Sequence, residues 1–389
     1  MRKILLATTA LIGFVAAGAA QAATAPLNVT VGGSIDFVAG AFHESRAAGA
    51  TNSSSGDFET LYTLDFGIAG KAANGITYGG ALALDNYPDM ITAIAGNSNN
   101  VAIRTADVFM SGAFGKIQLG DSRGATDLAI TPSAAGEGQV FGRYIDFLDT
   151  GTYSKIFVVG VDGLDHGTNV TYYTPKFGND TNKVQAAVTF EPYIYDFGSN
   201  VALTRKTAAT AGVSIYKNVV KGAMAYTGAF KDAKLDASAH IISGVSNVVG
   251  SNGKVRDFTA WGVGTQIASN GFTLGVNFAD WGHYFTQANQ NKSQQQYGAA
   301  LKYDFCCKLT VGVSYLGGNG YNIFSDLPIA ATGSNRNYTK EFNSYGAGGT
   351  YTWAPGLTTN VDAVLFGQKT NVTVKNDGYV LLISQKLAF

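Results

Sequence analysis

The sequence predicts an all-β protein: a transmembrane antiparallel β-barrel of about sixteen strands, with short turns at one end and long loops at the other. Three observations predict it. Only 14% of the residues are charged, against about 25% in ordinary soluble domains. After residue 22, no apolar run reaches the roughly 18 residues that a membrane-spanning helix needs. Segments that alternate oily and polar residues recur along the chain, as strands with one lipid-facing side do.

The alternation is clear in the stretches 62–68, 272–278, 297–305 and 309–315. In the last of these, the odd positions are Leu, Val, Val and Tyr, while the even positions are Thr, Gly and Ser. Side chains of a strand point alternately to opposite faces, so each stretch has one oily face. A soluble β-sandwich shows similar alternation, and the period alone therefore leaves both classes open.

The connections favour the barrel, because short and long ones alternate along the chain as periplasmic turns and outer loops do. Short connections fall at 71–75, 115–116, 178–183, Asn218, 269–271, 306–308 and 354–356, whereas 231–254 and 317–341 are long. The stretch 193–208 is either a loop or an extra β-ribbon. The predicted strands are 29–42, 58–70, 76–86, 101–114, 117–122, 169–177, 184–192, 209–217, 219–230, 255–268, 272–281, 294–305, 309–316, 342–353, 357–368 and 378–389.

The N-terminus predicts a secretory signal peptide over residues 1–22. Arg2 and Lys3 precede an apolar stretch, and Ala20-Gln21-Ala22 has the small-x-small pattern of a cleavage site. Residues 23–389 then form a single barrel domain. Removing two of the 27 basic residues leaves 25 against 27 acidic ones. A chain this close to neutral has no bulk positive charge to attract nucleic acid.

The final strand carries an oily face that ends in an aromatic residue. This face holds Tyr379, Leu381, Ile383, Leu387 and Phe389, and Gln385 is its one polar interruption. An edge strand of a soluble sheet is the alternative interpretation of this segment.

Two motifs extend the interpretation to a family. The run Phe114-Gly115-Lys116-Ile117-Gln118-Leu119-Gly120-Asp121 resembles the FGxxxLG turn and strand before the inward-folding loop of Gram-negative general porins. The run Asn169-Val170-Thr171-Tyr172-Tyr173-Thr174-Pro175 resembles the strand after that loop. With the signal peptide and the terminal Phe, the whole mature chain resembles these porins, most closely their α-proteobacterial branch.

The resemblance implies an outer-membrane channel for passive diffusion of ions and small hydrophilic solutes. It also implies a homotrimer in outer-membrane lipid, with the first strands, the last strand and the loop 88–99 near the interface. The apolar Met90, Ile91 and Ile94 of this loop either contact a neighbouring subunit or pack on the rim of their own barrel. The terminal Phe389 strand would be the signal for the barrel-assembly machinery. A channel selective for one solute class remains an alternative, and so does a plugged barrel that acts as an adhesin or surface enzyme.

The longest connection, 123–168, corresponds by position to the porin loop that narrows the lumen. Its charged residues are mostly acidic, and those assigned to the constriction are Asp127, Glu137, Arg143, Asp146 and Asp149. Residues 144–148 are predicted to form a short helical turn whose apolar side packs on the inner wall. An acidic surface loop facing outside water is the alternative.

The inward face of the wall offers fewer basic residues than the arginine cluster of many general porins. By alternation, Asp36, Asp65 and Asp85 point inward on the first strands. Arg104 is the clear basic residue there and is assigned to the constriction with the loop residues. Lys302 and Lys386 are lumen candidates elsewhere on the wall. This balance predicts a weak preference for cations.

Nothing in the sequence predicts an enzyme, a cofactor or a metal centre. The histidines His43, His166, His240 and His283 lie in or beside predicted loops without the spacing of a ligand pair. Loop-bound Ca²⁺ at Asp162 and Asp165 stays open, although the twelve-residue loop of a specific site is missing. The adjacent Cys306 and Cys307 are interpreted as turn residues.

Overall fold

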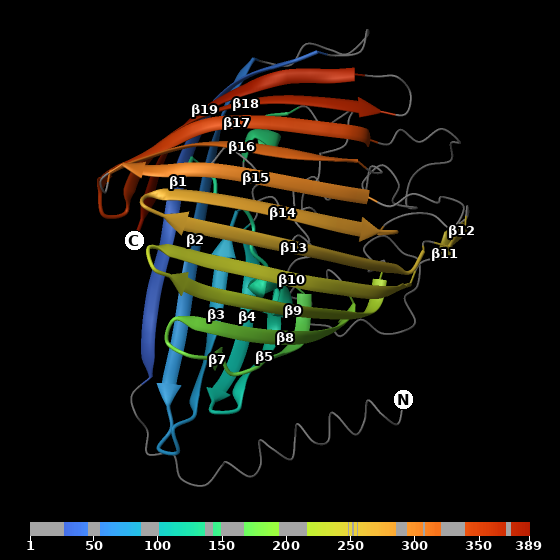
Figure 1. Cartoon of the computed structure of the whole chain (residues 1–389). Helices are drawn as coiled ribbons and strands as arrows, with labels where there is room; N and C mark the ends of the chain where they lie inside the picture. The colour runs from blue at the N-terminus through green and yellow to red at the C-terminus, as the bar shows by residue number, and fades with distance from the viewer. Residues whose placement is uncertain are drawn as a thin grey trace.

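The computed structural model shows a closed antiparallel β-barrel, so the predicted fold class is confirmed (Figure 1). The main sheet has seventeen strands, of which β7 is a two-residue piece that pairs with β8 beside β6, leaving sixteen strands in the wall. The structure describes residues 27–45, 55–86, 101–136, 143–148, 167–193, 216–247, 249–250, 253–254, 256–284, 294–305, 308–319, 339–370 and 375–389.

The strands follow one another around the barrel in chain order. Their bounds are β1 Asn28–Glu44, β2 Gly56–Lys71, β3 Thr77–Asp85, β4 Ala102–Gly112, β5 Gly115–Ser122, β6 Gly167–Tyr173, β7 Phe177–Gly178, β8 Asn182–Tyr193, β9 Tyr216–Phe230, β10 Ala233–Ser246, β13 Phe258–Ser269, β14 Phe272–Gly282, β15 Gln294–Phe305, β16 Leu309–Asn319, β17 Thr339–Ala354, β18 Leu357–Thr370 and β19 Lys375–Ala388. A separate two-stranded ribbon joins β11 Val249–Gly250 to β12 Gly253–Lys254.

The first and last strands close the barrel. β1 pairs with β19 from Ser34–Ala388 to Glu44–Gly378, and with β2 on its other side. Beyond this ladder, the backbones of Gly33 and Phe389 exchange two hydrogen bonds of 3.0 Å. Closure gives every strand two neighbours, so no open edge remains in the described wall.

One predicted turn and one predicted loop are wrong. Asn218 is not a corner between two strands: it lies inside β9, with φ of 52°. Asparagine adopts this left-handed conformation more readily than most residues and is therefore common in turns. This is why the sequence predicts a turn at Asn218. The segment 231–254 is not one long loop, because β9 and β10 join through a tight turn at Lys231 and Asp232. The sequence predicts two strands, 209–217 and 219–230, where the structure has β9, and it predicts no strand at β10. These two errors cancel, so the predicted number of wall strands remains sixteen.

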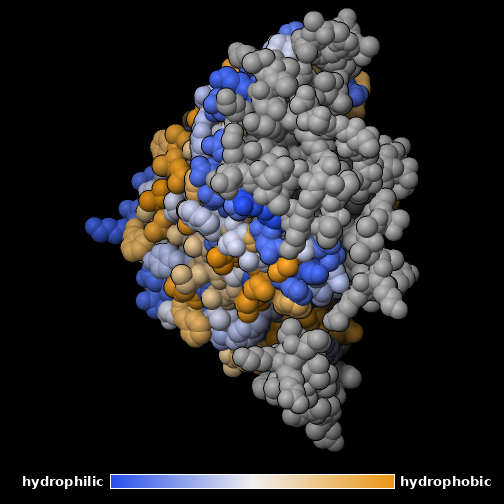
Figure 2. Space-filling view, turned by 90° about the vertical axis from the view of Figure 1, so that its right-hand side faces the viewer, coloured by the Kyte–Doolittle hydropathy of each residue, from blue (hydrophilic) through white to orange (hydrophobic). Residues whose placement is uncertain are grey.

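Burial alternates along the strands as expected for a barrel in lipid. In β18, Asn360, Asp362 and Val364 are buried on the inner side, whereas Val361 and Leu365 are more than half exposed on the outer side. Large apolar residues on the outer faces of nearly all wall strands are similarly exposed. Seen from the end that carries the long connections, hydrophobic residues gather along the flank of the molecule (Figure 2). No helix among the described residues is long and apolar enough to span a membrane.

Several predicted features lie outside the described residues. They are the signal peptide 1–22, the loop 88–99 with Met90, Ile91 and Ile94, the segment 194–215, His166, Glu137, Asp149, the Asp162–Asp165 pair and Cys306 with Cys307.

Deleting Phe389 is expected to lower the amount of folded protein in the outer membrane. The deletion removes two backbone hydrogen bonds at the closing seam, each worth about 0.5–1.5 kcal/mol. The heat-modifiable band of outer-membrane fractions on gels measures the effect. Phe389→Tyr keeps the backbone pair and the ring and serves as the control, which should remain near wild-type level. Equal levels of the deletion variant and the control would contradict the expectation.

Candidate pore constriction

The long connection between β5 and β6 begins with a short 3₁₀ helix, η1 (Gly124–Leu128), that packs on the inner wall. Ala125 is fully buried against Tyr173, Ala187 and Ala223 from three neighbouring strands. The Tyr173 hydroxyl lies 2.7 Å from the carbonyl of Gly124 and 3.2 Å from Oδ2 of Asp127. The first turn of the connection is therefore fixed inside the barrel.

A buried polar network holds the residues around η1. Lys221 of β9 and Glu191 of β8 form an ion pair of 2.9 Å, and neither side chain is exposed. Lys221 Nζ also reaches the carbonyl of Arg123 at 3.4 Å, while the amide of Ala125 donates to Thr189 Oγ1 at 2.7 Å. Removing one partner of such a buried pair typically costs about 3–5 kcal/mol, because the other charge is left without compensation.

The connection then crosses the inner wall strand by strand. The amide of Ile130 donates to Ser238 Oγ of β10 at 2.8 Å, and the carbonyl of Ile130 lies over Gly264 of β13, where a Cβ would overlap it. Further along, Pro132 lies against Gly275 of β14, at 2.8 Å from where a Cβ would be.

The crossing ends on β16 and β17. Ala135 lies 3.1 Å from where a Cβ of Gly312 would be, and the amide of Gly136 donates to Thr350 Oγ1 at 3.2 Å. Small wall residues thus form a shallow bed for the backbone from Ile130 to Gly136. We call the five wall residues Ser238, Gly264, Gly275, Gly312 and Thr350 the loop bed.

The second 3₁₀ helix of the connection, η2 (Arg143–Phe147), lies where the sequence predicts a helical turn at 144–148. Its aromatic residues Tyr144 and Phe147 are buried in an apolar cluster. Burial raises the pKa of the Tyr144 phenol to about 12, so this group is neutral near pH 7. The wall residues of the cluster come from β1 and β16 to β19, and are Val38, Leu316, Phe342, Val364, Phe366, Val380 and Leu382.

The charges around η2 differ from the expected arrangement of an acidic loop facing Arg104. Arg143 of the loop lies 3.9 Å from Asp36 of β1 and 3.9 Å from Glu59 of β2. Here the wall contributes the acidic side chains and the loop contributes the basic one, Arg143.

Arg104 is engaged within the wall. Its guanidinium lies 3.3 Å from Asp65 and 3.3 Å from Asp85. A register shift in the β3–β4 ladder accompanies this residue, and it lets both Arg104 and Asp107 lie on the inner side.

The remaining predicted residues are distributed as follows. Asp127 is held by Tyr173, and Asp146 lies in the first turn of η2. Lys302 lies on the inward row of β15, and Lys386 is opposite Asp36 in the β1–β19 ladder. All are brought to the barrel interior.

Sequence reasoning missed several charged residues of the interior, among them the four described next. Glu59 has the same parity as Asp65 on β2, and this spacing could have identified it. Glu191 and Lys221 were not connected because their pairing depends on the β8–β9 register. Lys116 lies over the rings of Phe109 and Tyr173, at 5.3 and 5.1 Å from their centroids.

The histidines require one correction. His240 lies within β10 and not in a loop, because the segment 231–254, which the sequence predicts as a connection, contains this strand. His283 is beside the guanidinium of Arg256, at 3.2–3.4 Å. Within the described parts of the chain, no group of three His, Cys, Asp or Glu residues is arranged to hold a metal ion.

The geometry defines a sixteen-stranded membrane barrel with an internal loop, which is the class of diffusion channels. The family model described as "Gram-negative porin" matches residues 7–371. The chain therefore belongs to the Gram-negative porin family and is an outer-membrane channel protein.

Solved structures agree in fold. The anion-selective porin from Comamonas acidovorans is 13% identical, with a TM-score of 0.59 over 94% of this chain and 100% of that one. OmpF from Salmonella typhi, in complex with daunomycin, is 14% identical, with a TM-score of 0.56 over 93% and 97%. OmpT from Vibrio cholerae, in its trimer form, is 13% identical, with a TM-score of 0.53 over 94% and 100%. No curated protein matches the sequence.

Replacing Gly264 by Leu is expected to lift the connection off the loop bed. The new side chain would occupy the place of the Ile130 carbonyl, and such overpacking typically costs about 1–3 kcal/mol. Displacement into the lumen should lower the single-channel conductance in a planar bilayer. Val263→Leu, the neighbouring outward position on β13, is the control and should conduct as wild type. A Gly264→Leu barrel that folds and keeps the wild-type conductance would contradict a loop held at this bed.

Proposed function

We propose that the protein is a passive diffusion channel for ions and small hydrophilic solutes, narrowed by the connection between β5 and β6. The observation that carries this proposal is the course of residues 130–136, which lie flat along the loop bed. A segment that lies flat against the wall narrows the lumen but does not block it as a folded plug would. The assignment of Asp127, Arg143 and Asp146 to the constriction rests on their place in this connection.

We further propose a weak preference for cations. On the inner wall, Asp65 keeps 48% of its side chain exposed beside Arg104, while Asp36 and Asp85 add buried carboxylates nearby. Apolar walls focus the field of such charges into the water, which raises the local concentration of counter-ions. The preference should fade as salt approaches about 1 M, where the screening length is about 3 Å.

The proposal includes the setting of the channel. The protein would reside in outer-membrane lipid after loss of residues 1–22, following insertion by the barrel-assembly machinery through the Phe389 strand. A homotrimer is supported by the trimer form of the Vibrio cholerae structure. Native mass spectrometry in mild detergent tests the stoichiometry, and only monomers would remove this part.

Conductance of the purified protein in planar bilayers tests the channel itself. A passive pore should conduct in proportion to salt concentration, and permeation of sugars should fall smoothly with their size. Saturation by one solute would favour a selective channel instead. Absence of conductance by the folded barrel would favour a plugged barrel and contradict the proposal.

Replacing Glu137, Asp146 and Asp149 together by their amides is expected to shift the zero-current potential in a salt gradient towards anion selectivity. The variant removes three negative charges from the connection, and local ion concentrations follow the sign of fixed charge. Arg143→Gln should shift the potential the opposite way, because Asp36 and Glu59 lose the nearby cation. Asp232→Asn, in the exposed tight turn between β9 and β10, is the control. An unchanged potential in the triple variant would place these carboxylates in outside water.

A further inference from the structure

Inward-facing lysines gather at the short-turn end of the barrel wall. Each has the same parity on its strand as residues of the inner side, such as Asp65 on β2 and Thr189 on β8. Each also lies among the last four residues of its strand at a short turn. They are Lys71 of β2, Lys116 of β5, Lys183 of β8, Lys234 of β10, Lys302 of β15 and Lys386 of β19. We call these six residues the lysine mouth.

Few acidic side chains share this end of the lumen. Within the same last four residues of the described strands, the inward carboxylates are Asp236 and Asp304. Asp236 lies 2.9 Å from Lys234, and Asp304 accepts a hydrogen bond from Thr310 Oγ1 at 2.6 Å. The net charge of this end is therefore positive, even when the C-terminal carboxylate at Phe389 is included.

Most of the lysine mouth keeps its charge available to the lumen. Among the described residues, four of the six lysines form no ion pair, namely Lys71, Lys116, Lys183 and Lys302. Lys71 and Lys183 are also exposed. An ammonium group that no carboxylate neutralises attracts anions from the surrounding water.

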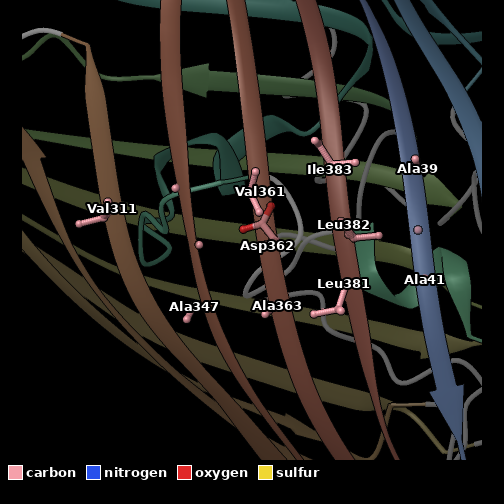
Figure 3. Close-up of a pocket in the computed structure, with 13 residues that line it drawn as sticks. Ala39, Ala41, Val311, Ala347, Val361, Asp362, Ala363, Leu381, Leu382 and Ile383 are labelled. Atoms are coloured by element: carbon pink, nitrogen blue, oxygen red, sulfur yellow. The ribbon is translucent and has the colours of Figure 1, made fainter.

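Further from the short turns, the inner wall changes sign. Its basic residues there include Arg104 and Lys221, whereas its more numerous carboxylates include Asp36, Asp65, Asp85, Asp107 and Asp362. Asp362 is buried on the inner side of β18, between the outward Val361 and Ala363 (Figure 3). A multiply charged anion is therefore attracted to the lysine mouth and repelled by the wall beyond it.

Strand register sets the spacing of the ammonium groups. Lys71 and Lys116 belong to one row of paired residues that runs from β2 to β5 through Thr77 and Ser111. Lys234 and Lys302 belong to another row, from β10 to β15. Neighbouring strands are about 4.8 Å apart, so three strand spacings separate the lysines of each row by about 14 Å. Groups this far apart do not converge on one phosphate, but they suit a flexible chain that carries charge along its length.

We propose that the lysine mouth binds a flexible polyanion of the phosphate class from the periplasmic side, and that the bound polyanion blocks the channel. Lysine acts towards phosphate as a point charge and needs no fixed hydrogen-bond geometry. In porin-type barrels the short turns face the periplasm. Small ions still pass both regions, and the positive mouth is one reason why the proposed cation preference is weak. The block, although not the binding, rests on the proposed channel function.

Block of single-channel current by linear polyphosphate tests the proposal. Polyphosphate is added at low salt to one side of a planar bilayer and then to the other. We expect a several-fold fall in conductance from one side only, because the acidic interior repels polyanions that approach from the long-loop end. Monophosphate at the same phosphate concentration should leave the conductance unchanged. The block should disappear as salt approaches about 1 M, where the screening length is about 3 Å.

A double variant connects the block to the lysine mouth. Lys71→Gln combined with Lys183→Gln removes two exposed charges that form no ion pair, and it should raise the half-blocking concentration several-fold. Lys217→Gln combined with Lys369→Gln removes the same charge at the long-loop end and is the matched control, which should be blocked as wild type. Without polyphosphate, both variants should conduct as wild type.

Isothermal titration calorimetry of the folded protein in a non-ionic detergent measures binding without current. Equal block from both sides, or equal half-blocking concentrations in the two double variants, would overturn the proposal. Tighter binding of oligoglutamate than of polyphosphate of equal charge would overturn it in favour of an acidic peptide. A protein that binds polyphosphate but does not conduct would keep the binding surface and contradict the channel function. Normal conductance without binding would contradict the lysine mouth alone.

Discussion

A strand that crosses lipid must pair its backbone N–H and C=O groups with neighbouring strands, because the hydrocarbon offers them no partner. This requirement governs the rest of the molecule. It forces β1 and β19 together, sets their register, and places Asp36 opposite Lys386 on the inner side. Once the ring is closed, the faces of each strand are fixed by alternation, with apolar side chains outside and the polar and charged ones inside.

The interior is organised by a second set of constraints, which act on the connection between β5 and β6. It is anchored at one end by the buried Lys221–Glu191 pair and the hydroxyls near η1, and at the other by the aromatic side chains of η2. From Ile130 to Gly136, the wall supplies glycines and the short hydroxyl side chains of Ser238 and Thr350. Arg143 then meets acidic residues of the wall, so the local field depends on how the anchors set the position of η2.

Much of the wall could be predicted because each strand repeats the same two-sided pattern. The prediction failed between 209 and 254, where that pattern is disturbed. Tyr216 and Val219 are both fully buried although they are three residues apart, since Asn218 shifts the parity within β9. β10 combines small outward alanines with an inward Asp236, Ser238 and His240, and this low contrast resembles a loop.

The site was less predictable than the wall, since its contacts depend on register. Ser238 and Gly264 are far apart in sequence, yet they are paired across β10 and β13 and together receive Ile130. Sequence parity placed Asp36, Asp65 and Arg104 on the inner side. It could not show that Arg104 is committed to Asp65 and Asp85, because this requires the irregular ladder between β3 and β4.

The loop bed has a consequence for how the channel can evolve. The wall meets the connection largely through main-chain atoms, at the amides of Ile130 and Gly136 and the carbonyl of Ile130. Main-chain contacts do not depend on which side chain a residue carries. The water-facing side chains of this stretch can therefore be exchanged while its backbone keeps the same path along the wall. The residue type is constrained instead at wall positions that are distant in sequence, such as Gly264, where a larger side chain would displace the loop. A lineage could therefore retune which solutes enter the cell by substitutions in the loop alone, while the barrel that carries it stays unchanged.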